Sequence, residues 1–253
     1  MALPNVPSGR LLVDSDGTAA WNMAVDEVML ENANVQEQAT LRFYHWLKPS
    51  QSLGYFQRAA DRREHHASFE CDWVRRASGG GAILHDESHC DLTYSICVPR
   101  FPRRTSAQLE LYHLFHESLV AVLAGVGVDS HLCTAEETTS KEPFLCFLRH
   151  SEGDVLLGTH KVAGSAQLRL GDAVLQHGSV LLSQSAFAPE LPGIRQLSSW
   201  ETDPVWLTKA WFDELQKRWP VAWATMPLDA AEEKRVREKF HLKFANPTWN
   251  RRR

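Results

Sequence analysis

Several features that would assign a chain to a common class are missing from this sequence. Its 253 residues contain five cysteines, an odd number with no CxxC pair, so no small disulfide framework is indicated. The formal net charge of -4 is not the basic excess typical of a general nucleic-acid binder. No apolar run approaches the ~20 residues that a membrane span needs, and residues 1–7 show no signal peptide. We therefore expect a cytoplasmic protein with reduced thiols that binds neither nucleic acid nor a membrane.

The sequence also has no standard nucleotide or hydrolase motif. Neither a Walker A loop nor GxGxxG is present. Ser165 lies in Gly-Ser-Ala and not in the GxSxG elbow of serine hydrolases, which disfavours a Ser-His-Asp hydrolase. The run from His85 to Cys90, His-Asp-x-x-His-Cys, has no second pair of ligands at matching spacing, so no metal site is predicted.

The pattern of apolar residues predicts an α+β fold. Hydrophobic residues make up 43% and charged residues 23% of the chain, as in an ordinary globular protein. Helical spacing predicts helices over 18–33, 108–126, 204–219 and 229–240. Strands are predicted over 41–47, 73–76, 82–85 and 92–98, and 155–170 with 173–183 as a hairpin that turns at 171–172. This mixture, without regular βαβ alternation, favours a largely antiparallel mixed sheet flanked by helices.

No internal repeat or Ser/Gly linker divides the chain. We therefore predict a single domain over 1–253, with 204–253 as its C-terminal helical extension. Asp26 and Glu27 in the first helix are interpreted as a solvated face, and His65 with His66 as a solvated pair. One apolar stripe of the helix over 108–126 is interpreted as core and not as a binding face: Tyr112, Phe115, Leu119, Val122, Leu123 and Val126.

Lys161 stands out because small residues surround it in the sequence. A lysine on a surface strand does not need such neighbours, whereas a lysine that touches a bound ligand does. The sequence therefore predicts a ligand-contacting lysine on the first arm of the hairpin. The small residues are Gly158, Ala163, Gly164, Ser165 and Ala166.

A second candidate is the glycine run that follows a predicted strand. Gly79, Gly80 and Gly81 can expose backbone N–H groups to an anion or a carbonyl, and Arg75 and Arg76 can supply charge beside them. This combination favours a ligand loop over a flexible turn.

Among the cysteines, Cys146 is flanked by Leu145 and Phe147. On these residues alone, a small core residue is the favoured interpretation over a catalytic one.

Taken together, six segments resemble the lipoate–protein ligase and octanoyltransferase family, within the superfamily that also holds biotin–protein ligases. The resemblance covers most of the chain and implies the catalytic-domain fold of that superfamily. The combination is specific, although each motif alone is not. The segments are Asn22–Glu27, Leu41–Tyr44, Ser52–Gln57, Arg75–Asp86, Lys161–Gln167 and Gln176–Ser179.

The family contains enzymes of two mechanisms. One branch of octanoyltransferases takes octanoyl from acyl carrier protein onto a cysteine in a Cys-Phe context shortly before the family's essential lysine. Cys146-Phe147 matches that context, 15 residues before Lys161. The resemblance therefore implies an acyltransferase that moves octanoyl through a Cys146 thioester to a lysine of a lipoyl domain, without a cofactor. It implies Cys146 and Lys161 as catalytic residues, and as substrate-binding residues Arg76, Ser78, Gly79, Gly80, Gly81, His85, Gly164, Ser165 and Ala166.

Two departures keep alternatives open. Residues 148–154 do not contain the Pro-Ser-x-Tyr-Glu pattern associated with the transferases, and Gly79–Gly81 is closer to the ligase version of the loop. The rival interpretation is an ATP- and Mg-dependent lipoate–protein ligase in which Cys146 is a spectator. A third is a non-catalytic acyl- or lipoyl-domain-binding protein. Octanoate versus lipoate, the acceptor (a glycine-cleavage carrier protein or a 2-oxoacid dehydrogenase subunit), the general base and the oligomeric state are left open.

Overall fold

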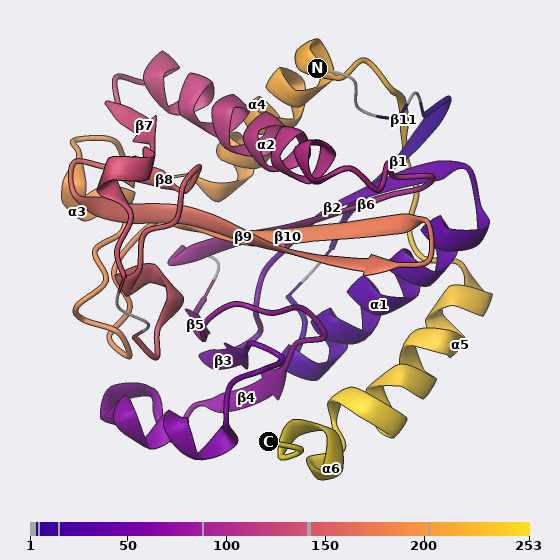
Figure 1. Cartoon of the computed structure of the whole chain (residues 1–253), viewed down its shortest axis with the longest axis horizontal. Coiled ribbons are helices and arrows are strands. Elements are labelled where there is room, and N and C mark those ends of the chain that lie inside the picture. The colour runs from indigo at the N-terminus through magenta and orange to yellow at the C-terminus, as the bar shows by residue number, and fades with distance from the viewer. Residues whose placement is uncertain (1–3, 5, 15, 88, 141–142, 202) are drawn as a thin grey trace.

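The computed structural model describes residues 4, 6–14, 16–87, 89–140, 143–201 and 203–253 (Figure 1). Its strands are β1 (Ser8–Val13), β2 (Gln38–Tyr44), β3 (Ser50–Leu53), β4 (Asp72–Arg75), β5 (Ile83–His85), β6 (Asp91–Val98), β7 (Ser130–Leu132), β8 (Val155–Leu157), β9 (His160–Leu170), β10 (Ala173–Leu181) and β11 (Ala222–Thr225). Its α-helices are α1 (Ala19–Val35), α2 (Thr105–Gly125), α3 (Ile194–Leu197), α4 (Pro204–Arg218), α5 (Ala230–Lys239) and α6 (Pro247–Asn250). Short 3-10 helices span Ala59–Glu64, His66–Ser68, Ala135–Glu137 and Cys146–Leu148, and a π-helical turn spans Phe240–Phe244.

One large mixed sheet runs through the middle of the molecule. Its strand order is β11-β1-β2-β6-β10-β9-β8-β7. Strand β1 pairs in parallel with both of its neighbours, and the other described pairs of this sheet are antiparallel. The predicted α+β class with a largely antiparallel sheet is therefore confirmed.

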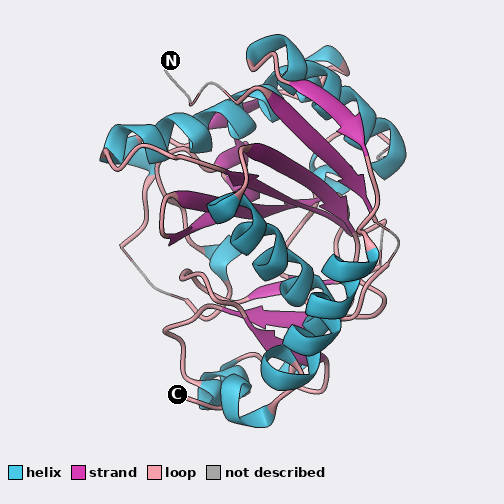
Figure 2. Ribbon diagram, turned by 90° about the vertical axis from the view of Figure 1, so that its right-hand side faces the viewer, coloured by secondary structure: helices cyan, strands magenta, loops and turns pink. Residues whose placement is uncertain are grey.

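Helices cover both faces of this sheet, and the two views agree on their placement (Figures 1 and 2). Helices α2 and α4 pack together over one face, where Phe43, Tyr94, Phe115 and Trp211 share one apolar core. Helix α1 covers the other face and is itself covered by α5. It begins after Thr18, whose hydroxyl accepts a hydrogen bond from the backbone N–H of Trp21 at 3.3 Å.

A smaller sheet lies below the large one in the view of Figure 1. Its order is β4-β3-β5, with β3 parallel to β4 and antiparallel to β5. The predicted strands over 73–76 and 82–85 belong to it.

Two further predictions about local structure need correction. The segment 155–170 is not one arm, because Gly158 adopts a φ of +58° and turns the chain between β8 and β9, which pair antiparallel. His65 is not a solvated residue, since its ring contacts Ser68 and Glu190.

The segment 204–253 packs against the elements that precede it. Helix α4 lies on α2, β11 pairs with β1, and α5 lies on α1. This segment contains the strand β11 in addition to its helices, and the single-domain organisation stays a prediction. No helix among the described residues has the length and apolar character that crossing a membrane requires.

Candidate active site

A cavity of about 370 Å³ lies where the two sheets, α2 and the 144–154 loop meet. Its wall brings together residues that are far apart in the sequence. Eight of the eleven predicted site residues line it: Arg76, Gly80, His85, Cys146, Lys161, Gly164, Ser165 and Ala166.

The two predicted catalytic side chains point toward each other. Nζ of Lys161 lies 3.7 Å from Sγ of Cys146. Cys146 opens a 3-10 helix, and its backbone N–H donates to the carbonyl of Ala82 at 2.7 Å. A β-carbon on Gly81 would lie 3.2–3.3 Å from Cys146 atoms, so the glycine allows the close approach of the two segments.

Asp154 holds Lys161 from the other side. Its Oδ2 lies 2.8 Å from Nζ of Lys161, and both side chains are buried. Oδ1 accepts a hydrogen bond from the hydroxyl of Tyr112 at 2.7 Å, and Oδ2 also accepts from the backbone N–H of Ser151 at 2.7 Å. Neither residue was predicted from the sequence, because Asp154 lies in an irregular loop and Tyr112 belongs to a stripe interpreted as core. Tyr112 is half-buried and lines the cavity, which corrects that interpretation.

The small residues beside Lys161 have two different roles. A β-carbon on Gly164 would lie 2.4 Å from Cε and 2.7 Å from Nζ of Lys161, so Gly164 makes room for the lysine itself. A β-carbon on Gly158 would meet nothing within 4 Å, and this glycine serves the turn before β9. The expectation that every small neighbour makes room for a ligand is therefore wrong for Gly158.

Arg76 holds the backbone of the glycine loop in place through hydrogen bonds. Its guanidinium donates to the carbonyl and hydroxyl of Ser52 and to the carbonyls of Gly79 and Gly81, at 3.0 and 2.9 Å for the glycines. Burial lowers the pKa of Arg76 to about 10, against the opposing effect of a charge on Cys146. The guanidinium thus stays charged at neutral pH and places its charge next to the cavity.

The remaining predicted loop residues do not line the cavity. Arg75 uses its guanidinium on the carbonyls of Gly54, Tyr55, Gln57 and Asn250, so it holds the backbone and does not offer charge to a ligand. The Oγ of Ser78 lies 2.6 Å from Nε2 of His177. Gly79 lies against Phe56, and Gly81 against Cys146.

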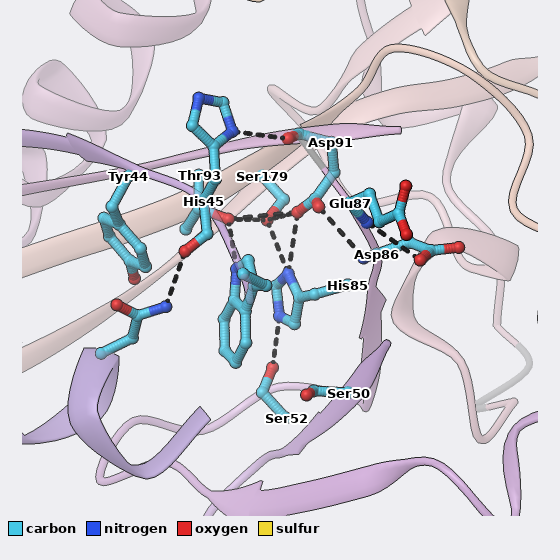
Figure 3. A network of polar contacts seen from close by, with 12 residues as sticks. Tyr44, His45, Ser50, Ser52, His85, Asp86, Glu87, Asp91, Thr93 and Ser179 are labelled. Carbon is cyan, nitrogen blue, oxygen red and sulfur yellow. Dashed lines mark hydrogen bonds and ion pairs between the residues drawn. The ribbon is translucent and has the colours of Figure 1, made fainter. Parts of the chain in front are cut away.

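His85 lines the cavity, and Figure 3 shows its ring between Asp91 and Ser52, with hydrogen bonds to both. Its ring stacks on Trp46 at 3.7 Å between centroids, its Nδ1 lies 2.9 Å from Asp91, and its Nε2 lies 2.8 Å from Oγ of Ser52. Burial lowers the pKa of His85, although Asp91 opposes this effect. Both ring nitrogens are therefore engaged by the protein in a neutral ring.

Asp26 is buried, which contradicts its interpretation as part of a solvated face. Its carboxylate lies 2.8 Å from Nη1 of Arg42 and 3.1 Å from Nδ1 of His177, which lines the cavity. Burial alone would raise the pKa of Asp26, but the hydrogen bond from His177 and the charge of Arg42 outweigh it and lower the pKa. The helix α1 therefore supports the cavity wall from below, while Glu27 pairs with Lys239.

Ser165 connects the cavity to α2. Its Oγ lies 2.7 Å from the hydroxyl of Tyr94 and 2.8 Å from Nε2 of His116. Nδ1 of His116 lies 2.6 Å from the carbonyl of Gly153, so Nδ1 carries the proton and Nε2 accepts from Ser165. Burial lowers the pKa of His116 to about 4. Neither Tyr94 nor His116 was a candidate from the sequence, because both lie on elements dominated by apolar residues.

The histidines of the His-Asp-x-x-His-Cys run do not converge. His85 is buried against Trp46, whereas His89 is exposed. Within the described ranges, no group of three or more His, Cys, Asp or Glu side chains is arranged to hold a metal ion.

Comparison with known proteins places this geometry in a family. The model of the lipoyl protein ligase A/B catalytic domain matches residues 18–190. The octanoyltransferase LipM of Kyrpidia tusciae is 38% identical over 182 residues, which cover 68% of this chain and 65% of that protein. The chain thus spans just under two thirds of that relative. The octanoyltransferase LipM of Halalkalibacterium halodurans is 28% identical over 275 residues, covering 96% of this chain and 99% of that protein.

Solved structures support the same fold. A protein of T. acidophilum with bound lipoic acid superposes with a TM-score of 0.79 at 21% identity, covering 97% of this chain and 100% of that one. A lipoate-protein ligase A bound with ATP gives a TM-score of 0.78 at 21% identity, with 96% and 98% covered. With a family model that matches more than half of its residues, the chain belongs to the lipoyl protein ligase A/B catalytic-domain family.

Proposed function

We propose that this chain is a protein acyltransferase of lipoate metabolism that moves octanoyl from acyl carrier protein, through a thioester on Cys146, to a lysine of a lipoyl domain. The observation that carries the proposal is the 3.7 Å separation between Sγ of Cys146 and Nζ of Lys161 in the cavity wall. An ammonium group at this distance stabilises a thiolate, the nucleophilic form of cysteine. The likeness to octanoyltransferases LipM supports the same assignment.

In the first half-reaction, the Cys146 thiolate attacks the thioester carbonyl of the donor. The new C–S bond forms as the bond to the donor sulfur breaks, and the donor leaves as a thiol after it takes up a proton. One thioester replaces another, so the step is close to thermoneutral. The proposed reaction therefore needs neither ATP nor Mg²⁺.

In the second half-reaction, the neutral amine of the acceptor lysine attacks the acyl-cysteine. A C–N bond forms, the C–S bond breaks, and the departing Cys146 sulfur can accept the proton that the nitrogen releases. Lys161 donates to the acyl oxygen while negative charge develops on it. The product is an amide on the acceptor and a free thiol on the enzyme.

The inner part of the cavity suits an apolar acyl tail. Trp46, Met23 and Ile83 contribute apolar surface to its wall. His85 is polar, but both of its ring nitrogens already have protein partners, so an alkyl chain beside it leaves no polar group unpaired. We therefore place the octanoyl chain along this wall, with its carbonyl between Cys146 and Lys161.

The proposal extends to partners and location. The donor is octanoyl-acyl carrier protein, and the acceptor is a glycine-cleavage carrier protein or the lipoyl domain of a 2-oxoacid dehydrogenase subunit. All five cysteines are unpaired thiols. Reduced thiols support a cytoplasmic setting, where a cysteine nucleophile stays active.

Intact-protein mass spectrometry after incubation with octanoyl-acyl carrier protein, without ATP, tests the proposal. We expect one octanoyl adduct on the wild-type chain and none on Cys146→Ala. Cys71→Ser is the matched control, because Cys71 is half-buried and lies outside the cavity, and it should acquire the adduct. Addition of an apo lipoyl domain should then discharge the adduct and octanoylate the acceptor.

The outcome that contradicts this proposal is equally specific. If Cys146→Ala keeps wild-type activity and modification of the lipoyl domain requires ATP, the chain is an ATP-dependent lipoate–protein ligase. If neither assay modifies the acceptor while the domain still binds, the chain is a binding protein.

A further inference from the structure

Asp154 is built into the site more firmly than a surface carboxylate. It is 1% exposed, and Lys161 is 5% exposed. Besides the ion pair with Lys161 at 2.8 Å, Asp154 accepts hydrogen bonds from the Tyr112 hydroxyl and the Ser151 backbone. Tyr112 in turn accepts from the backbone N–H of Ser165 at 3.3 Å. Strand β9 and helix α2 thus fix this carboxylate beside the lysine.

The charges around Lys161 change during the proposed reaction. While Cys146 is a thiolate, the ammonium has two anionic neighbours, Cys146 at 3.7 Å and Asp154 at 2.8 Å. Once Cys146 carries an acyl group, its sulfur is neutral and Asp154 is the remaining anion of the pair. A buried ammonium without a counter-ion loses its proton readily, because burial disfavours the charged form.

We propose that Asp154 is a positioning residue for the second half-reaction, keeping Lys161 charged and aimed at the acyl oxygen when Cys146 is acylated. This inference rests on the proposed function. As the acceptor nitrogen bonds to the acyl carbon, the carbonyl electron pair moves onto oxygen, where the Lys161 ammonium meets it. When the pair returns, the C–S bond breaks and the sulfur accepts the proton from the nitrogen. Asp154 itself exchanges no proton in this sequence.

Single-turnover measurement of the two half-reactions on Asp154→Asn tests the inference. Formation of the octanoyl adduct should stay near the wild-type rate, because Lys161 and the Cys146 thiolate then neutralise each other. Transfer to the lipoyl domain should slow about 100-fold, as on loss of one donor to a developing oxyanion. The acyl-enzyme of the variant should therefore accumulate.

The pH profile separates this role from a structural one. In the wild type, transfer should accelerate as rising pH deprotonates the acceptor lysine. In Asp154→Asn, the profile should change shape and transfer should gain less from rising pH, because the Lys161 ammonium has lost its counter-ion at 2.8 Å. A general loss of structure would slow both half-reactions together and leave the shape of the profile unchanged.

Two further variants complete the test. Glu232→Gln removes a buried carboxylate that pairs with Arg10 at 2.7 Å, away from the cavity, and should leave both half-reactions and their pH profiles unchanged. Tyr112→Phe removes one hydrogen bond to Asp154 but leaves its charge. It should slow transfer by about tenfold and leave the rate of acylation unchanged. If Asp154→Asn does not fold, this variant tests the positioning role of Asp154 in its place.

The inference is overturned if Asp154→Asn, or Tyr112→Phe in its place, transfers at the wild-type rate. It is also overturned if both half-reactions fall equally with an unchanged pH profile. Absence of any adduct on the wild-type Cys146 is a different result, because it contradicts the proposed function and not the role of Asp154 alone.

Discussion

A β-carbon on Gly164 would lie 2.4 Å from Cε of Lys161, closer than unbonded carbon atoms approach in proteins. The side chain of Lys161 therefore lies directly against the backbone of β9 at Gly164. Its Nζ atom contacts Asp154 and Cys146. Glycine is needed here for space and not for a special backbone conformation, because Gly164 is not among the glycines with positive φ.

Gly164→Ala should displace Lys161 and slow acylation of Cys146. Misplacement of a catalytic group by about 1 Å costs on the order of 100-fold in rate. Adduct formation with octanoyl-acyl carrier protein, followed by mass spectrometry over time, measures the effect.

Gly158→Ala is the matched control on the same hairpin. Its φ of +58° makes alanine strained, so stability should fall by about 1 kcal/mol, but the adduct should form at the wild-type rate. Equal rates of adduct formation for the two variants would show that Gly164 is not needed to position Lys161.

Arg76→Lys should loosen the glycine loop. The planar guanidinium donates to Ser52, Gly79 and Gly81 at once, and the single ammonium group of a lysine cannot make the same set of hydrogen bonds. We expect kcat/KM for the acyl donor to fall by about tenfold or more, as unpaired buried carbonyls cost about 1–3 kcal/mol. Arg58→Lys, at an exposed ion pair with Asp61, should leave kcat/KM unchanged, and an unaffected Arg76→Lys variant would contradict the role given to the guanidinium.

His116 should make the protein less stable in mild acid. Its pKa in the folded state is about 4, below the ordinary 6.5, because of burial. The unfolded chain therefore binds this proton first, so the contribution is complete above pH 6.5 and is lost as pH falls toward 4. The difference between 6.5 and about 4, at about 1.4 kcal/mol for each pH unit, amounts to about 3–4 kcal/mol.

Urea unfolding at a series of pH values checks this expectation. His116→Gln should be less stable than the wild type at pH 7 but should show a shallower loss between pH 6.5 and 4. Parallel curves for the two proteins would mean that His116 does not titrate in this range.

Asp26→Asn should destabilise the fold, because it leaves the buried Arg42 without one of its counter-charges. Loss of one partner from a buried ion pair costs about 3–5 kcal/mol. Asp14, which also pairs with Arg42, should keep the loss near the lower figure. In urea unfolding, Asp213→Asn at an exposed pair with Lys209 should cost less than about 1 kcal/mol, and a similar loss in both variants would argue against a structural role for Asp26.

The local sequence pattern was sufficient to predict most helices and strands. It also predicted several of the residues that line the cavity. Apolar spacing predicted α2 and α4, which bury stripes whose period shows in the sequence, and also α1 and α5, although α1 is buried on most of its surface and α5 buries only Glu232 and Val236. The glycine loop and Lys161 were found because they form short motifs, whereas Cys146 became a candidate through the resemblance to the family. The turn at Gly158 was missed, as one glycine in a run of strand formers does not show its φ.

Residues that act through partners distant in the chain were the ones that pattern could not reveal. Asp26 was assigned to a solvated face, the usual place of a charged residue in a helix, yet Arg42 and His177 reach it from two strands of the large sheet. Tyr112 follows the spacing of the core residues of α2. It belongs to the site because its hydroxyl donates a hydrogen bond to Asp154, which is distant in the sequence.

Chemical identity along the chain was thus enough to recognise the family and to predict Cys146 and Lys161 as catalytic residues, because these depend on short segments with fixed residue types. The electrostatics of the site depend on which side chains share a buried space, and that follows from the pairing of β8 with β9 and the packing of α2 over them. The energy of interaction between two charges depends on their separation and on their burial, and neither can be read from the spacing of residues in the sequence. Asp154 therefore emerged as the partner of Lys161 once the fold had brought them within 2.8 Å.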